Sequence, residues 1–325
     1  MSNIDQRTTP EALPPRAPRR SVADLFGLWW RGFAMGSADV VPGVSGGTMA
    51  FILGIYEELI DSIRGLTTPA FLSPLSKGKL AEAWGAGNLS FLVAVGVGIL
   101  SAILTFARAL EYALHNYPVY LWSFFFGLVI ASAVVVSRRV KNWNPTLILA
   151  ALVGTVAAFW LVGLVPAETP NTWWFLILSG AFAICAMILP GISGAFILLI
   201  LGKYEYVLSA VKNFEIGTVA LVAIGAFAGL LSFARVLSWL FHRYHDLTVA
   251  LLIGLMVGSL RKIWPWKEVV REIFDAQGEL LEQITRNVVP ALNSELGIAL
   301  ALMIIGFVVV LLLERLAPPE LEVGS

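Results

Sequence analysis

The sequence is poor in charged residues. Only 14% of its 325 residues are Asp, Glu, Lys or Arg, whereas 58% are hydrophobic. Soluble domains carry about 25% charged residues, so most of this chain's surface is expected to face lipid. Its 22 basic and 22 acidic residues give a net charge of +0, which indicates no nucleic-acid partner. The composition therefore predicts an integral membrane protein.

Cysteine and histidine are also scarce. The single cysteine, Cys185, excludes an intramolecular disulfide and a cysteine-clustered metal site. His115 and His242 lie near the ends of apolar runs, where we expect the membrane interface. His242 and His245 could share a helix face, but no Cys or carboxylate cluster lies beside them. We therefore expect no metal and no cofactor.

The chain divides into two membrane repeats between polar ends. Residues 1–20 are polar and rich in Pro and Arg, which predicts a disordered cytoplasmic tail. They are not expected to be a signal peptide, because no apolar core follows the charges. The first transmembrane repeat is expected at 21–165 and the second at 166–317. The second includes a polar loop, 262–295, expected on the membrane surface, and a short tail follows at 318–325.

A Pro-Gly-x-Ser-Gly sequence interrupts two long apolar runs. It begins at Pro42 and again at Pro190, 148 residues later, and nine of the sixteen positions in 42–57 are identical in the second copy. Irregular backbone is tolerated at membrane depth only where protein or a watery cavity covers it. We therefore expect each break to divide a re-entrant helical hairpin.

Further matches extend this duplication beyond the breaks. Phe106-Ala107-Arg108 recurs as Phe233-Ala234-Arg235, at an offset of 127. The spans are expected at 89–114, 120–137, 146–165, 216–240, 247–260 and 297–313. Three spans separate the two hairpins, so the copies should be inverted. The predicted fold is an all-α polytopic membrane protein with an inverted repeat, about six full spans and two re-entrant hairpins.

Inverted repeats with discontinuous helices are typical of alternating-access transporters, although duplication for structure alone is the alternative. The positive-inside rule favours a cytoplasmic N-terminus. The basic residues then placed inside are Lys77, Lys79, Arg138, Arg139, Lys141, Arg243 and Arg315, and the outer segment 165–172 has none. Those that oppose this orientation are Arg261, Lys262, Lys267 and Arg271.

The breaks carry the candidate substrate-binding residues, which are Ser45, Gly46, Gly47, Thr48, Ser193 and Gly194. If a half-helix starts after each break, its free amides and positive dipole end form an anion pocket, to which the serines add hydroxyl donors. The alternative is that the glycines only let helices pack and the serines only cap them.

Arg108 and Arg235 occupy matching places in apolar helices. An arginine at membrane depth needs an anionic partner or a watery cavity, and its guanidinium fork suits phosphate oxygens. We expect both to bind substrate. Alternatively they extend to the interface, or pair with carboxylates such as Glu57, Glu111 or Glu205.

Three carboxylates are candidates for coupling transport to protons. Glu57 and Glu205 follow tyrosines at equivalent places, where burial raises a carboxyl pKa and a nearby arginine lowers it. Structural Arg–Glu pairing is the alternative. Asp39 has no acidic counterpart and could be a proton site or a helix cap. Glu58 and Asp61 are expected to face water.

The motif residues resemble those of the PopT polyprenyl-phosphate transporter family. They are Asp39-Val-Val-Pro-Gly-Val-Ser-Gly-Gly-Thr48, Gly54-Ile-Tyr-Glu-Glu58, Leu189-Pro-Gly-Ile-Ser-Gly194 and Tyr204-Glu205, and the resemblance covers roughly 32–260. It implies translocation of undecaprenyl phosphate across the cytoplasmic membrane, which returns the carrier lipid after cell-wall polymer synthesis. Ala195-Phe196 stand where the first copy has Gly47-Thr48, so the half-sites are unequal.

Two other functions remain open from the residues alone. A small-anion transporter or channel would use the same anion pocket without a lipid. A membrane phosphatase would be an enzyme with a nucleophile or a metal beside histidines inside the membrane, and the three histidines fall away from both Ser-Gly breaks. The sequence therefore favours a transporter over an enzyme.

Overall fold

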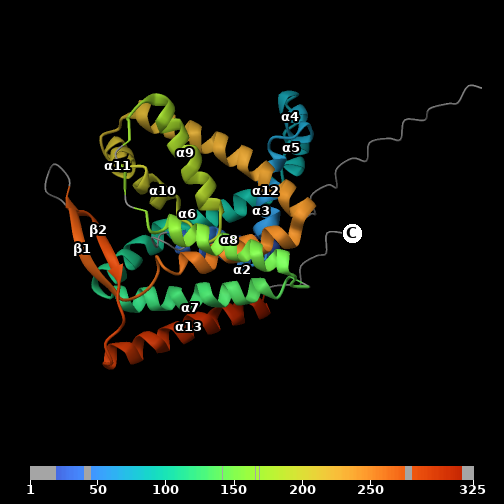
Figure 1. Ribbon diagram of the computed structural model, residues 1–325. Helices are drawn as coiled ribbons and strands as arrows, with labels where there is room; N and C mark the ends of the chain where they lie inside the picture. Colours follow the sequence, from blue (N-terminus) through green and yellow to red (C-terminus); the bar gives the residue numbers. More distant parts are fainter. Residues whose placement is uncertain are drawn as a thin grey trace, which may run out of the picture.

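The computed structural model describes residues 20–39, 45–140, 142–164, 166–167, 169–274 and 280–316 (Figure 1). The predicted tails at 1–20 and 318–325 lie outside these residues, apart from Arg20, as do Pro42 and Gly43 of the first break.

Helices form almost all of the described chain, as the sequence predicts. In chain order they are α1 (Val22–Asp39), α2 (Gly46–Ile52), α3 (Tyr56–Gly65), α4 (Pro69–Ser76), α5 (Leu80–Ala86), α6 (Leu89–Asn116), α7 (Pro118–Ser137), α8 (Pro145–Leu161), α9 (Trp173–Ile188), α10 (Gly194–Ile200), α11 (Tyr204–Lys212), α12 (Ile216–Ser259) and α13 (Ser294–Leu316). The predicted polar connector between the first break and α6 thus contains two short helices, α4 and α5.

Four of the described helices are long and apolar enough to cross a membrane, namely α6, α7, α12 and α13. The pair α10 and α11 is a fifth candidate, bent by 109° at its break, and α8 and α9 are apolar but shorter. One face of α6 exposes Val93, Val97, Leu100 and Leu104, at the spacing of a single helical stripe. The chain is therefore a multi-pass membrane protein whose apolar faces suit lipid.

The two sequence copies adopt the same local structure. Helices α10 and α11 begin 148 residues after α2 and α3, and the glycines between them both have positive φ, 68° at Gly54 and 61° at Gly202. Tyr117, between α6 and α7, has φ −137° and ψ 49°, and Tyr244, at the kink of α12, has φ −139° and ψ 50°. The predicted spans 216–240 and 247–260 are therefore the two arms of one kinked helix.

Packing within the copies also repeats. A Cβ on Gly98 of α6 would overlap the backbone of α1, and a Cβ on Gly225 of α12 would overlap the backbone of α9. These glycines lie 127 residues apart, at equivalent positions. Small residues that let helix backbones approach closely are typical of packing in membranes, where apolar burial does not drive association.

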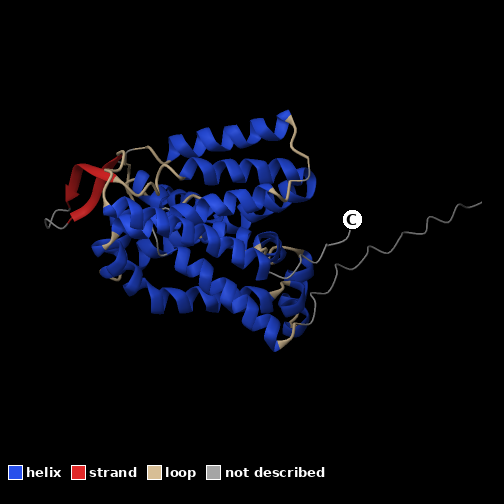
Figure 2. Ribbon diagram, turned by 90° about the horizontal axis from the view of Figure 1, so that it is seen from below, coloured by secondary structure: helices blue, strands red, loops and turns tan. Residues whose placement is uncertain are grey.

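The polar loop predicted at 262–295 is instead a β-hairpin, so the all-α prediction is wrong there. Strands β1 (Lys267–Phe274) and β2 (Leu280–Asn287) pair antiparallel, with Lys267 opposite Asn287. The Trp264 indole N–H donates to the Val288 carbonyl oxygen at 2.9 Å and holds the base of the hairpin. Figure 2 shows the hairpin at one end of the helical bundle.

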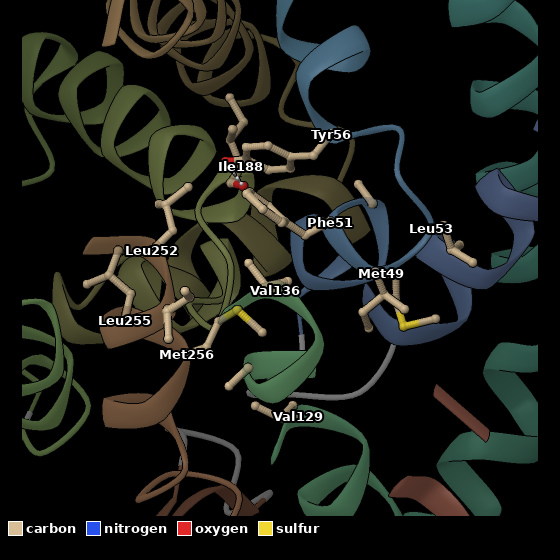
Figure 3. Packing of buried hydrophobic residues seen from close by; sticks show 14 of the residues in the cluster. Met49, Phe51, Leu53, Tyr56, Val129, Val136, Ile188, Leu252, Leu255 and Met256 are labelled. Carbon is tan, nitrogen blue, oxygen red and sulfur yellow. Dashed lines mark hydrogen bonds between the residues drawn. The ribbon is translucent and has the colours of Figure 1, made fainter. Parts of the chain in front are cut away.

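The core lies around the first break. All residues of α2 are buried, and they pack with buried residues of α7, α9 and α12 (Figure 3). The Phe51 and Tyr56 rings are tilted against each other with a centroid distance of 4.5 Å, and the Phe241 ring of α12 contacts both. The broken segment therefore sits at the centre of the molecule, surrounded by spanning helices.

Candidate functional site

The two breaks contact each other directly. Side chains that follow the first break bond to the backbone of the second. These bonds join Ser45 Oγ to the Met187 and Leu189 carbonyl oxygens (3.1 and 3.2 Å), the Tyr56 hydroxyl to the Ile188 carbonyl oxygen (3.1 Å) and the Gly191 amide to Thr48 Oγ1 (3.0 Å). A broken segment leaves backbone groups unpaired at membrane depth, and here side chains of the first break satisfy backbone groups of the second.

The start of α2 is occupied by the chain's own groups. The Gly46 amide donates to Asp39 Oδ1 at 2.6 Å, and the Gly47 amide donates to Ser45 Oγ at 3.1 Å. A Cβ on Gly47 would overlap the Ile188 carbonyl oxygen, so only glycine allows this approach. Ser45 and Thr48 are 1% and 0% exposed. The predicted anion pocket is therefore closed in this conformation, because a built-in carboxylate and a capping hydroxyl occupy its donors.

The second break is not an equal copy of the first. Ser193 precedes α10 as Ser45 precedes α2, yet its side chain makes no capping hydrogen bond and is half-buried. Gly194 is buried against α9, where a Cβ would meet the Ala183 carbonyl oxygen at 2.7 Å. The inequality predicted from Ala195-Phe196 is thus present in the capping of the two helices.

A line of polar side chains, the α3–α12 seam, joins helix α3 to helix α12. Its partners lie far apart in the sequence, and the helices run in opposite directions along it. The contacts are Glu57 Oε1 with His245 Nε2 (3.1 Å), Asp61 Oδ1 with Ser238 Oγ (2.5 Å), Arg64 Nη1 with Ser238 Oγ (3.2 Å), Asp61 Oδ2 with His242 Nε2 (3.9 Å), and Thr67 Oγ1 and O with Arg235 Nε and Nη2 (2.8 and 3.1 Å).

A pocket of about 570 Å³ opens at one end of this seam. It is lined by Arg64, Thr67, Thr68, Pro69, Arg235, Trp239 and His242. Neither Arg64 nor Arg235 forms an ion pair with any carboxylate among the described residues. The lining thus combines two guanidinium groups and an imidazole with an apolar indole.

The residues predicted for the site do not meet in one cavity. Arg235 lines the pocket and Glu57 lies in the seam, whereas Asp39 belongs to the contact between the breaks. Arg108 on α6 and Glu205 on α11 are exposed, and within the described chain neither side chain forms a hydrogen bond or ion pair. Arg108 and Arg235, which are equivalent in the sequence repeat, therefore lie in separate regions of the structure.

Sequence reasoning missed several residues of the seam. Asp61 is predicted to face water and His242 to lie at an interface. Both side chains are exposed, and both also contact side chains across the seam. A spacing signal was available, because seam residues recur at helical intervals. The sets are Glu57, Asp61 and Arg64 on α3, and Arg235, Ser238, His242 and His245 on α12.

No group of three or more His, Cys, Asp or Glu side chains that could hold a metal ion occurs in the part of the chain that the structure describes.

Comparison with known proteins points to one family. A family model described as "Undecaprenyl phosphate translocase-like" matches residues 35–281. A relative from Vibrio cholerae serotype O1, named "Polyprenyl-phosphate transporter", is 42% identical over 301 residues, which cover 90% of this chain and 97% of that protein. A Staphylococcus aureus protein of the same name is 29% identical over 257 residues, or 72% and 84% of the two chains. No solved structure matches.

Proposed function

Because the chain belongs to the undecaprenyl phosphate translocase-like family, we propose that it moves polyprenyl phosphate, such as undecaprenyl phosphate, across the cytoplasmic membrane. The observation that carries the proposal is the likeness, over 90% of the chain, to a protein named as such a transporter. The carrier lipid would return to the inner leaflet after use in cell-envelope synthesis, and the protein acts as a transporter and not as an enzyme.

We propose an inverted repeat of six full spans and two re-entrant hairpins, with the N-terminus in the cytoplasm. The kink of α12 at Tyr244 and the junction of α6 and α7 at Tyr117 lie towards opposite ends of the molecule in Figure 1. The contacts agree with this placement, because Trp122 near the start of α7 lies against Lys267 of the hairpin, while His245 beside the kink lies against α3. Equivalent bends at opposite ends support inversion.

The packing of the two copies is unequal, which supports alternating access. Helix α3 packs along α12, whereas the equivalent helix α11 has no comparable contact with α6 among the described residues. Inverted repeats exchange conformations between the two states of a transporter. In the opposite state α11 would pack along α6, and Arg108 would take the place that Arg235 has here.

This exchange requires the two breaks to separate. The polar groups of Ser45, Gly46, Gly47 and Thr48, which are now bonded within or between the breaks, and those of Ser193 and Gly194 would then face the pathway. A phosphate crossing the midplane would replace the contacts between the breaks with bonds of its own, because amides and hydroxyls are good phosphate donors. These residues would therefore bind the substrate only while its phosphate crosses the midplane of the membrane.

Protons are the proposed coupling ion. Glu57 pairs with His245 beside the kink, so a proton gained or lost there changes the bond that joins α3 to α12. Glu205 occupies the equivalent position on α11 and would act in the opposite state. Asp39 holds the start of α2, and its protonation would release the Gly46 amide.

Translocation in proteoliposomes tests the function. Purified protein should move labelled undecaprenyl phosphate between leaflets, while undecaprenol, which lacks the phosphate, should not be moved. Transport of inorganic phosphate with no effect on the lipid would identify a small-anion transporter instead. Release of phosphate from undecaprenyl diphosphate by the pure protein would identify a phosphatase.

A further inference from the structure

The pocket at the end of the α3–α12 seam holds two arginines that no described carboxylate contacts directly. Arg64 bonds to a serine hydroxyl and Arg235 bonds to the hydroxyl and carbonyl oxygens of Thr67, so both charged groups have only neutral partners. The nearby carboxylate of Asp61 is engaged by Ser238 and lies 3.9 Å from His242 Nε2. A guanidinium has five N–H donors, and each arginine keeps several of them for a ligand.

The walls of the same pocket are partly apolar. Trp239 is 58% exposed and lines the pocket with the arginines, and Pro69, the first residue of α4, also lines it. The volume of about 570 Å³ falls in the range of about 300–1,000 Å³ that is typical of sites for small organic ligands. A pocket with cationic donors and an indole wall suits an amphiphile whose head is an anion.

From these features we propose that Arg64, Arg235 and His242 form a docking site for the phosphomonoester head of a polyprenyl lipid. This inference rests on the function proposed above and specifies where its substrate first binds. The guanidinium groups hold the phosphate oxygens, and Trp239 covers the first isoprene units. His242 Nδ1 bonds to the Ser238 carbonyl oxygen, so its Nε2 adds a donor to the phosphate when the imidazole is protonated. Arg108 takes no part in this conformation, because it lies outside the pocket.

Equilibrium binding to the full-length protein in nanodiscs tests the proposal without requiring transport. The ligands are a labelled short-chain polyprenyl phosphate and the matching polyprenol, with inorganic phosphate as competitor. Loss of one charge-assisted bond corresponds to about a 10-fold weaker affinity or more. We expect that effect for Arg64→Gln and for Arg235→Gln, and a smaller one for Arg64→Lys, which keeps the charge but not the planar fork.

The matched control is Arg243→Gln. Arg243 is exposed on the same helix, stacks over Tyr244 with 5.6 Å between guanidinium carbon and ring centroid, and does not line the pocket. It should bind the lipid as the unaltered protein does, and thermal midpoints of all variants report whether each is folded. Unchanged affinity in both Arg64→Gln and Arg235→Gln, with folding intact, overturns the site.

Comparison of the three ligands shows whether the pocket binds a lipid head group or soluble phosphate. Weak binding of polyprenol and displacement of the lipid only by a large excess of inorganic phosphate support the lipid head group. Equal affinity for inorganic phosphate and the lipid would assign the pocket to soluble phosphate and overturn the lipid assignment. Normal translocation with no loss of binding in the two variants would refute the site alone, whereas lipid binding without translocation would refute the transport function alone.

Discussion

At the residue scale, Gly47 sets how closely the two breaks approach each other. A Cβ there would overlap the Ile188 carbonyl oxygen, and that oxygen belongs to a backbone already held by Tyr56. Overpacking of this kind costs about 1–3 kcal/mol. Gly47→Ala should therefore lower the free energy of unfolding, and the thermal midpoint in detergent measures it.

Gly96 provides the control for that prediction. It lies within α6, and a Cβ built there has no neighbour within 4 Å. Alanine in a helix interior is favoured over glycine by about 0.5–1 kcal/mol, so Gly96→Ala should keep or raise the midpoint. Equal midpoints for the two variants would mean that the breaks do not touch as closely as described.

Lys267 makes the stability of the hairpin depend on pH. Its ammonium lies over the Trp122 ring at 4.3 Å, and burial, followed by the charge of Lys262, lowers the pKa of Lys267 to about 7. The pKa of a lysine in an unfolded chain is about 10.4. Between these values the unfolded chain binds a proton that the folded hairpin does not, so the stability of the hairpin rises with pH through this window and is lowest below pH 7.

Hydrogen exchange of the β1 and β2 amides measures this effect. Protection should increase from about pH 7 to about pH 9 after correction for intrinsic exchange, and Lys267→Met should remove the increase. Lys79→Met is the control, because Lys79 is exposed at the start of α5 and pairs with Glu82 of that same helix. An increase that persists in Lys267→Met would show that another group is responsible.

At the element scale, the two tyrosines that follow the breaks occupy equivalent sequence positions but make different contacts. Tyr56 is buried and donates to the Ile188 carbonyl oxygen, whereas its counterpart Tyr204 is 39% exposed and has no hydrogen bond among the described residues. Tyr56→Phe should cost about 1 kcal/mol, as for a typical buried hydrogen bond, and Tyr204→Phe almost nothing. Similar losses for both, measured by denaturation in detergent, would contradict the unequal contact.

Sequence reasoning recovers the elements that local pattern determines. The break motif and the Tyr117 and Tyr244 positions repeat in the sequence, and the same backbone conformations repeat in the structure. The hairpin was missed because register shifts between Val269 and Arg271 and between Ile273 and Phe274 interrupt the two-residue alternation of a strand. The charged segment then resembles a surface helix.

The candidate site was only partly predictable for a different reason. Arg235 and Glu57 could be selected because an arginine or a carboxylate at membrane depth needs a partner. Their partners, Thr67 and His245, are brought close only by the packing of α3 on α12. No local pattern encodes that packing, so the pocket and the occupied start of α2 follow from tertiary structure alone.

At the scale of the whole molecule, α3 packs along α12, and the described residues show no matching contact between α11 and α6. The proposed alternating access interprets this packing as one of two states. In a Cys185→Ser background, Asp61→Cys with Ser238→Cys should form a disulfide, because the native side chains approach to 2.5 Å. The equivalent pair, Ser209→Cys with Glu111→Cys, should link only when the opposite state is visited. Failure of this second pair to link in membranes would argue against exchange between the copies.

The requirement for α3 and α12 to separate is tested most directly by one measurement. It is the translocation of undecaprenyl phosphate by the Asp61→Cys, Ser238→Cys protein before and after oxidation. The disulfide holds α3 on α12, so the oxidised protein should stop moving the lipid between leaflets and reductant should restore the rate of the same sample. An oxidised, fully linked protein that translocates as fast as the reduced one would contradict the account, because transport would then proceed without separation of these helices.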